Sequence, residues 1–271
     1  MAEGLLLYQV DSFTPVPYAG NPAGVCLLEK EMSDKWMQAV AADMNLSETA
    51  FLFRGKDSYS LRWFTPTVEV NLCGHATLAA AHVLWEENLL EKDEKARFIT
   101  RSGPLFASLD PPWIEMDFPT QPVNAATDPG GLLAALGIGK PAFMGKAGED
   151  YFIELDLESE VRHLKPNFRA MAKIEARGTI VTAKSSTKGY DFVSRFFAPG
   201  YGIDEDPVTG SAHCALGPYW KKKLHKERMF ARQVSPRGGE LHVIPAEERV
   251  FLAGEAVTVF RGELMAIDEI K

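Results

Sequence analysis

The chain has 271 residues, of which 46% are hydrophobic and 24% charged, so it can bury a sizeable core; its length fits two domains or one large α/β unit. With 37 acidic against 29 basic residues the net charge is -8, which argues against nucleic acid as a partner. No basic residue precedes the short apolar run near the N-terminus and no stretch reaches membrane-spanning length, so we expect neither a signal peptide nor a membrane partner. Three cysteines without Cys-x-x-Cys spacing indicate a reducing compartment, and we predict a cytoplasmic protein.

Most of the first half of the chain is predicted to be β-structure. A helix interrupts it: Ser33 is a candidate N-cap, the apolar residues of 33–44 have amphipathic helical spacing, and Asn45 can supply a left-handed stop. The β-rich runs, each bounded by Gly, Pro, Asn or Asp, are residues 4–11, 23–29, 48–53, 59–65, 96–101, 104–109 and 113–118.

Two further helices are expected to lie inside the protein. Residues 76–85 are apolar almost all round, which is typical of a helix enclosed by other structure. Residues 212–220 are similar and are followed by three lysines, residues 221–223, placed where the negative end of a helix favours cations. Pro218 predicts a kink in this second helix.

An internal repeat organises the chain. Residues 62–66 (RWFTP) correspond to 195–199 (RFFAP) at an offset of 133, whereas 74–76 (GHA) and 101–103 (RSG) correspond to 210–212 (GSA) and 237–239 (RGG) at an offset of 136. A three-residue insertion explains the change of offset. Matches in the same order at a nearly constant offset predict two copies of one structural unit.

The boundary between the copies is expected near two prolines that follow a strand-like run. We predict a first domain over residues 1–118, a linker over 119–123 that contains Pro119 and Pro122, and a second domain over 124–271.

Both enclosed helices begin at a glycine, Gly74 in the first copy and Gly210 in the second. A helix N-terminus offers unpaired N–H groups and a partial positive charge, so it binds carboxylate or phosphate readily. If the copies face one another across a pseudo-twofold axis, both helix starts point into one cleft, and a small anion is the natural occupant. The alternative is that each glycine merely permits a tight turn; repetition in both halves favours the ligand site.

Two carboxylates are candidates for proton transfer. Glu48 has small or apolar neighbours, and burial without a partner would raise its pKa toward neutrality; the alternative is a solvated strand residue. Asp206 is fixed beside Pro207 just before the second glycine and can reach the cleft floor as a hydrogen-bond acceptor or a second acid/base group. The preceding acidic residues 204 and 205 are explained by the helix dipole alone.

Three more side chains lie at the helix starts. His75 is expected to be neutral, because the positive helix end lowers its pKa, and its equivalence to Ser211 in the second copy predicts that both line one site. Cys73 is either a thiolate activated by the helix start or a small buried hydrophobe.

Metal and cofactor sites have little support in the sequence. A zinc site would draw on Cys73, His75, His213 and Cys214, but adjacent ligands on a helix point about 100° apart and no pair has metal-site spacing. The sequence has none of the dinucleotide, P-loop or nucleophile-elbow patterns. We therefore predict no metal and no cofactor.

Several blocks of the sequence form a recognisable set. They are AGNPAGVCLL (19–28), MNLSETAF (44–51), RWFTP (62–66), LCGHATLA (72–79) and EDPVTGSAH (205–213), supported by SRFFAP (194–199) and RGGEL (237–241). Over nearly the whole chain these blocks resemble the phenazine biosynthesis PhzF-like family of isomerases. The resemblance implies the α+β fold of diaminopimelate epimerase, with two pseudo-repeated domains, each a strongly curved sheet around a central helix, and the active site in the cleft between them.

The resemblance also implies residue roles. By motif, Glu48 matches the family's proton-transferring glutamate, and His75, Asp206 and Ser211 match the residues around the substrate. We therefore expect a cofactor-independent isomerase, often a homodimer, that moves a proton between carbons of a small carboxylate. The predicted catalytic set is Glu48, His75 and Asp206, and the predicted substrate-binding set is Gly74, Gly210, Ser211 and Cys73.

Two alternatives remain. The first is a thiol epimerase or racemase acting through Cys73, although residues 207–210 supply no opposing cysteine and Cys214 lies about one turn inside the helix. The second is a non-catalytic scaffold that retains the cleft and binds another protein.

Overall fold

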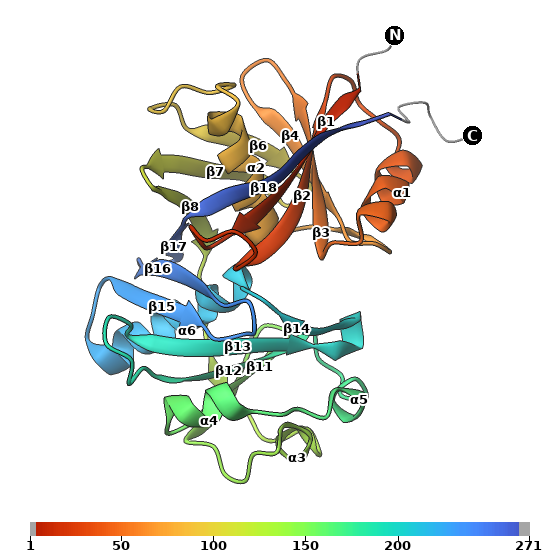
Figure 1. The fold of residues 1–271 in the computed structure, drawn as a ribbon. Helices are drawn as coiled ribbons and strands as arrows, with labels where there is room; N and C mark the ends of the chain where they lie inside the picture. Colours follow the sequence, from red (N-terminus) through yellow and green to blue (C-terminus); the bar gives the residue numbers. More distant parts are fainter. Residues whose placement is uncertain (1–3, 266–271) are drawn as a thin grey trace. The chain divides into compact units, whose positions relative to one another are not determined.

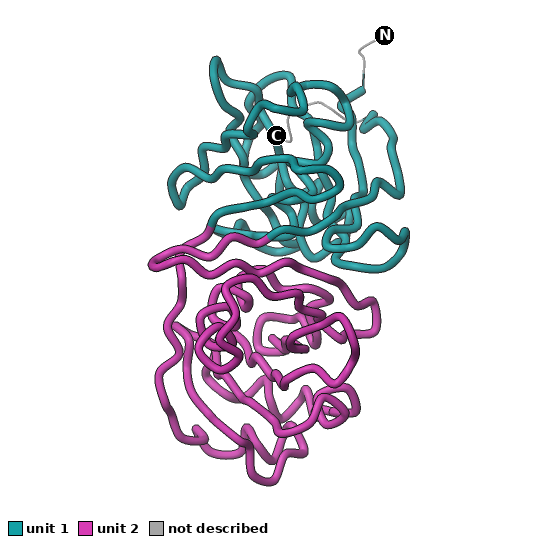
Figure 2. Tube along the Cα trace, turned by 90° about the vertical axis from the view of Figure 1, so that its left-hand side faces the viewer, with its two compact units in different colours: residues 1–117, 253–271 teal, residues 118–252 magenta. Residues whose placement is uncertain are grey.

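The computed structural model describes residues 4–265 and divides into two compact units, which Figure 2 colours separately. Unit 1 comprises residues 1–117 and 253–271, and unit 2 comprises residues 118–252. The chain thus passes from one unit to the other twice.

Among the described residues, unit 1 holds two helices and nine strands (Figure 1). They are β1 (Leu5–Ser12), β2 (Asn21–Leu28), α1 (Asp34–Met44), β3 (Glu48–Arg54), β4 (Tyr59–Phe64), β5 (Glu69–Val70), α2 (Gly74–Glu86), β6 (Ala96–Thr100), β7 (Gly103–Asp110), β8 (Trp113–Pro119) and β18 (Ala256–Leu264). One of these strands, β8, extends two residues past the limit at residue 117. All the strands predicted from the β-rich runs are present, with ends displaced by no more than two residues.

The strands of unit 1 pair in both senses. β2 runs parallel to β3 and β4 parallel to β6, whereas β1–β2, β3–β4, β4–β5, β6–β7 and β7–β8 are antiparallel. The two parallel pairings each need a crossover, and α1 and α2 provide them.

The local signals for α1 are confirmed. Ser33 Oγ accepts a hydrogen bond from the backbone N–H of Trp36 at 3.3 Å, and Asn45 ends the helix in the left-handed region at φ 50°. Trp36 packs edge-on against Phe51 of β3, so the apolar face of α1 is covered by the sheet.

Helix α2 is enclosed, as its composition predicts. Residues 75–81 and 83–85 are all buried, and the helix contacts β1, β2, β3 and β18. It begins at Gly74, two residues before the predicted start, with Cys73 as an extended N-cap residue.

Unit 2 has the same kinds of element. They are β9 (Asn124–Ala125), α3 (Leu132–Leu136), β10 (Phe143–Ala147), β11 (Asp150–Glu154), α4 (Glu158–His163), α5 (Phe168–Met171), β12 (Gly178–Lys184), β13 (Phe192–Ala198), the 3₁₀ turn η1 (Pro199–Tyr201), β14 (Ile203–Asp206), α6 (Gly210–Leu224), β15 (Met229–Gln233), β16 (Gly239–Pro245) and β17 (Arg249–Gly254), which ends two residues beyond the unit.

The strand pairings of unit 2 follow those of unit 1 in chain order and sense. β11 runs parallel to β12 and β13 parallel to β15, whereas β10–β11, β12–β13, β13–β14 and β15–β16 are antiparallel. An arginine on β4 and another on β13 each form a bidentate ion pair with a glutamate on the next strand: Arg62 with Glu69 of β5, and Arg195 with Glu205 of β14. The second pair is three residues further apart in sequence, which locates the predicted insertion.

Helix α6 accommodates Pro218 in its interior. Proline has no N–H to donate to the carbonyl of Cys214, four residues earlier, and that carbonyl instead accepts the backbone N–H of Gln121 at 3.0 Å. The helix continues through the three lysines, residues 221–223, to its left-handed cap at His225. Neither this helix nor any other in residues 4–265 is long and apolar enough to cross a membrane.

The C-terminal strand departs from the predicted domain division. The second domain was expected to run over 124–271, but β18 pairs antiparallel with β1, and Leu264 lies opposite Leu5. Unit 2 therefore ends at residue 252. The repeat alone cannot show this, because it gives the order of the elements and not the sheet that the last strand joins.

Candidate functional site

A buried cluster of Glu48, Cys73 and His75 lies in unit 1. The Oε2 atom of Glu48 is 3.2 Å from Nε2 of His75, and the Cys73 sulfur is 3.5 Å from Nδ1 of the same ring. The side chains of His75 and Glu48 are only 6% and 14% exposed. The structure thus brings together three of the predicted residues, placing an acid, a base and a thiol within contact of one another.

Secondary structure fixes this cluster from two directions. Glu48 is the first residue of β3, and His75 is the second residue of α2. Ser12 at the end of β1 donates its hydroxyl to the backbone carbonyl of His75 at 2.8 Å, and the Ser47 hydroxyl is 3.3 Å from Nε2 of the ring. Because the ring is held at its backbone and at its edge, its position relative to Glu48 is set before any ligand binds.

The pKa of Glu48 differs from the expectation. Burial raises it, as predicted, but the adjacent His75 charge and hydrogen bonds from His75, Ser47 and Cys73 outweigh burial, so the pKa lies below its ordinary value. The expected raised pKa is therefore wrong, because the sequence gives no sign of a partner 27 residues away. The carboxyl is ionised at neutral pH and ready to accept a proton.

The pKa of His75 is also opposite to the expectation. Burial lowers it, but the Cys73 sulfur and the Glu48 carboxylate both favour the imidazolium, and together they raise the pKa well above its ordinary value. The dipole argument for a neutral ring is wrong here, because a carboxylate in contact outweighs half a charge at a helix end. Glu48 and His75 form a buried ion pair.

Replacing His75 with glutamine is expected to raise the pKa of Glu48 above its ordinary value. Burial is the largest influence on this carboxyl and would no longer be opposed by a cation. The measurement is a pH titration of the ¹³C-labelled glutamate carboxyls by NMR, with the Glu48→Gln protein identifying the resonance.

The matched control is His82→Gln, because His82 lies 3.6 Å from Glu86 at the other end of α2 and does not contact the cluster. It should leave the Glu48 resonance unchanged. A Glu48 pKa that stays below its ordinary value in folded His75→Gln protein would disprove the ion-pair account.

The Cys73 thiol is not activated. Burial, and then the nearby Glu48 carboxylate, raise its pKa to about 11, and the side chain is 6% exposed. The sulfur is therefore protonated at neutral pH, which supports the reading of Cys73 as a small buried residue and opposes a thiolate.

The same three residues are the one group in the described part of the chain whose donor atoms lie close enough to hold a metal ion, all within 4.8 Å of one another. The donor types suit zinc. A metal would require the thiol and the imidazolium to lose their protons and would break the Glu48–His75 ion pair. The geometry therefore favours acid/base chemistry. Of the four residues considered for a zinc site in the sequence, Cys73 and His75 belong to this group, whereas His213 and Cys214 do not.

His213 is a structural residue of α6. It is fully buried, its Nδ1 lies 2.8 Å from the backbone carbonyl of Thr209, and its ring contacts Phe192. Burial lowers its pKa to about 4, so the ring is neutral and Nδ1 donates to the carbonyl. Thr77 makes the corresponding bond in α2, from its hydroxyl to the carbonyl of Cys73 at 2.5 Å.

The predicted residues of unit 2 gather at the start of α6. Asp206 accepts a hydrogen bond from the Thr209 hydroxyl at 2.5 Å. Gln233, at the end of β15, donates to the Asp206 carbonyl at 2.7 Å and accepts the backbone N–H of Thr209 at 2.9 Å. One glutamine side chain therefore ties the strand that carries Asp206 to the residue preceding Gly210.

An arginine that the sequence analysis did not consider contacts Ser211. Both terminal nitrogens of Arg177 lie 3.3 Å from Ser211 Oγ, and the guanidinium is also paired with the buried carboxylate of Asp150. Neither α2 nor α6 has a side-chain hydrogen bond from its N-cap residue, Cys73 or Thr209. The first backbone N–H groups of both helices are therefore not capped by these side chains, and anion binding there stays a prediction.

The predicted residues therefore form two groups. Cys73, Gly74, His75 and Glu48 lie together in unit 1, and Asp206, Gly210 and Ser211 lie together in unit 2. The sequence did not predict the residues that hold these side chains in place. Ser47 could have been found from its place beside Glu48, whereas Arg177 and Gln233 have no local motif.

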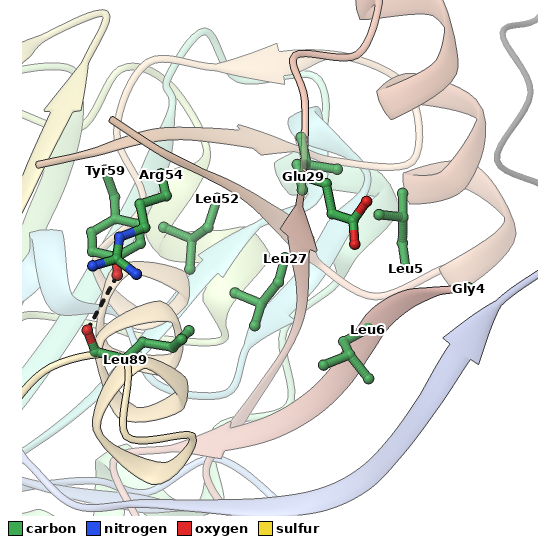
Figure 3. A pocket seen from close by; sticks show the side chains of 10 residues that line it. Gly4, Leu5, Leu6, Leu27, Glu29, Leu52, Arg54, Tyr59 and Leu89 are labelled. Atoms are coloured by element: carbon green, nitrogen blue, oxygen red, sulfur yellow. Dashed lines mark hydrogen bonds between the residues drawn. The ribbon is translucent and has the colours of Figure 1, made fainter. Parts of the chain in front are cut away.

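A pocket elsewhere in unit 1 contains none of the predicted residues. It measures about 210 Å³ and is lined mainly by leucines, with Glu29, Arg54 and Tyr59 among them (Figure 3). The Tyr59 hydroxyl already donates to the carbonyl of Leu89. The residues that line this pocket include none of the predicted proton-transferring groups.

Comparison with known proteins identifies the family to which the chain is similar. Residues 10–262 match the family described as phenazine biosynthesis-like protein. An "uncharacterized isomerase" of Halalkalibacterium halodurans is 52% identical over 260 residues, which cover 96% of this chain and 98% of that protein. Relatives with such names confirm the prediction of an isomerase.

Solved structures agree with the fold. A PhzF-family protein of Enterococcus faecalis, 41% identical, superposes with a TM-score of 0.91 over 96% of this chain and 99% of that one. A hydroxyproline epimerase of Agrobacterium vitis, 11% identical, has a TM-score of 0.64 over 98% and 94% of the two chains, a likeness of fold alone. The chain belongs to the phenazine biosynthesis-like PhzF family and has its mixed α/β, diaminopimelate epimerase-like fold.

Proposed function

We propose that the protein is a cofactor-independent isomerase that moves a proton between carbons of a small carboxylate, with Glu48 as the acid/base group. The observation that carries this is the buried pair at the start of α2, in which the Glu48 carboxylate lies 3.2 Å from the His75 imidazole. Since the pair keeps Glu48 ionised, the carboxylate is ready to take the first proton.

His75 has two tasks in this mechanism. While Glu48 is ionised, the imidazolium balances its charge within a buried site. Once the proton has moved to Glu48, the imidazolium loses that partner and donates to the negative charge developing on the substrate. Glu48 then returns the proton to a different carbon of the same molecule, so the overall reaction consumes no external acid or base.

The second half of the proposed site comes from unit 2. The recurring strand pairings and the two arginine–glutamate pairs support two pseudo-repeated domains, each with a curved sheet around a central helix. We assign Asp206 to accepting a hydrogen bond from the substrate or acting as a second acid/base group. The helix starts at Gly74 and Gly210, with Ser211, would bind the substrate carboxylate.

The setting of this activity is part of the proposal. A cytoplasmic homodimer is expected, and neither nucleic acid nor a membrane is a partner. Phenazine chemistry is not assigned, because the residues described here recognise a carboxylate and a transferable proton and not a particular ring.

Replacing Cys73 with alanine is expected to retain the incorporation of solvent deuterium into a reacting carboxylate. The thiol is buried and protonated, with a pKa of about 11, so it is a poor base beside an ionised glutamate. The rate should fall by less than about tenfold, because only the sulfur's hydrogen bond to the His75 ring is lost. The measurement is ²H NMR of the product formed in deuterated water.

Cys26→Ala, which replaces another buried free cysteine of unit 1, controls for loss of a core sulfur. Loss of labelling in Cys73→Ala protein but not in Cys26→Ala protein would establish the thiol epimerase and remove Glu48 from the role of sole base.

A further inference from the structure

The contact between Arg177 and Ser211 determines which way the serine hydroxyl points. A guanidinium has five N–H donors and no acceptor. Since both of its terminal nitrogens lie 3.3 Å from Ser211 Oγ, the serine oxygen accepts from arginine. Its own O–H hydrogen must therefore be directed elsewhere.

Among the described residues, the Ser211 hydroxyl forms hydrogen bonds with Arg177 alone, so its O–H has no acceptor there. Ser211 is the second residue of α6, where the backbone N–H groups also favour an anion. The hydroxyl thus adds a donor to a place that already attracts a negative group.

Asp150 explains why the arginine stays in this orientation. Its carboxylate is 1% exposed and takes the Nε and Nη2 hydrogens of Arg177, with Nε to Oδ1 at 2.9 Å. The ring of Phe196 lies 5.5 Å from the guanidinium carbon. A bidentate pair with a buried carboxylate holds the guanidinium plane, so the edge that faces Ser211 is fixed.

We infer that Arg177 is a positioning residue for substrate recognition: it turns Ser211 into an obligate hydrogen-bond donor aimed at the substrate carboxylate. The inference rests on the proposed function for the identity of the ligand. The contact between Arg177 and Ser211 does not depend on that function, and the experiments below test the contact and the ligand separately.

The first measurement needs no ligand. In Ser211→Cys protein, the introduced thiol should be acidified by the adjacent guanidinium, and adding Arg177→Gln should remove that effect. We expect iodoacetamide to alkylate this thiol at pH 7 more slowly by about threefold or more in the double variant, since the fall in thiolate fraction is partly offset by greater nucleophilicity. Peptide mapping distinguishes it from the three native cysteines, all buried.

Arg162 provides a matched control within unit 2. It is 36% exposed and pairs with Glu158, which is 3% exposed, whereas Arg177 is 34% exposed and its partner Asp150 is 1% exposed. Adding Arg162→Gln to Ser211→Cys should leave the alkylation rate unchanged. Equal rates with and without Arg177 would overturn the inference, whatever the protein's reaction.

The second measurement uses acetate as the probe, titrated by NMR into the wild type, Ser211→Ala, Arg177→Gln and the double variant. Ser211→Ala should weaken acetate binding by about tenfold when Arg177 is present, as loss of a hydrogen bond to a charged group does. In the Arg177→Gln background the same change should cost less than about threefold. Arg177→Lys should not restore the coupling, because an ammonium lacks the planar fork.

The outcomes separate the two claims. An equal cost of Ser211→Ala in both backgrounds would overturn the positioning role. Failure of wild-type protein to bind acetate or any other small carboxylate would contradict the proposed function and the donor role toward its substrate, even with the expected alkylation rates.

Discussion

Glu48→Gln is expected to slow proton transfer by about 10²- to 10⁴-fold, the usual contribution of a positioned acid/base group. Glutamine keeps the length of the side chain and a hydrogen-bonding oxygen near His75 Nε2, but the amide cannot carry the proton. The fall should appear in kcat, because the missing step follows binding. The measurement is turnover of a reacting carboxylate, with circular dichroism confirming that the variant is folded.

Glu86→Gln is the matched control for this substitution. Glu86 also lies beside a histidine of α2, with its Oε2 atom 3.6 Å from His82 Nε2, but at the opposite end of the helix. It should change turnover by less than about threefold. Wild-type turnover by folded Glu48→Gln protein would remove the glutamate from the mechanism.

Acidification is expected to destabilise the protein through His213. Burial lowers the pKa of this ring from 6.5 to about 4, so between these two pH values the unfolded chain binds more protons than the folded one. The free energy of unfolding therefore falls as the pH drops from 6.5 through about 4, by about 3 kcal/mol from this residue. Urea unfolding at a series of pH values measures the slope.

The variant His213→Thr copies the corresponding residue of α2, Thr77, whose hydroxyl donates to the carbonyl four residues earlier. It should be less stable than wild type at pH 7, because the smaller side chain leaves a cavity, yet its stability should fall less between pH 6.5 and 4. His163→Thr removes an exposed ring with a similar contact, Nδ1 to the Ser159 carbonyl at 2.7 Å, and should keep the wild-type slope. A parallel pH dependence of the His213→Thr and wild-type proteins would refute the assignment.

His75 contributes with the opposite sign. Its folded pKa is raised, so its stabilisation is complete below the unfolded value of about 6.5 and is lost as the pH rises through the folded value. The lowered pKa of Glu48 gives stabilisation that is lost on acidification. Since the pH ranges in which these groups affect stability overlap with that of His213, the contribution of a single residue is obtained only from the difference between the wild-type and variant stability curves.

Features set by neighbouring residues in the chain were predictable. The cap at Ser33, the left-handed stop at Asn45 and the buried faces of α2 and α6 depend on local hydrogen bonds and on composition. The repeat predicted equivalent helices in the two halves. It could not predict that β18 joins β1, because that pairing links residues about 250 positions apart.

The candidate site was predictable in its residues and not in their charge states. Motifs supplied Glu48, His75 and Ser211, but a pKa depends on what lies within a few ångströms. The His75 imidazole, 3.2 Å from the Glu48 carboxylate, reversed the expected pKa shift of Glu48, and the contacts of the ring with Cys73 and Glu48 reversed that of His75. Arg177 could not be predicted for the same reason, since its contact with Ser211 joins residues 34 positions apart and follows from no sequence pattern.

The most direct test of the account is a screen of small unsaturated and amino carboxylates in deuterated water, read by NMR for hydrogen exchange at carbon. It requires no assumption about the product and detects the proposed step itself. We predict that at least one carboxylate acquires deuterium at a carbon position with the wild-type protein and that the labelling drops by about 10²-fold or more with Glu48→Gln. Labelling that proceeds equally well with both proteins, or no labelling and no isomerisation of any carboxylate by the wild type, would contradict the claim that Glu48 carries a proton between carbons.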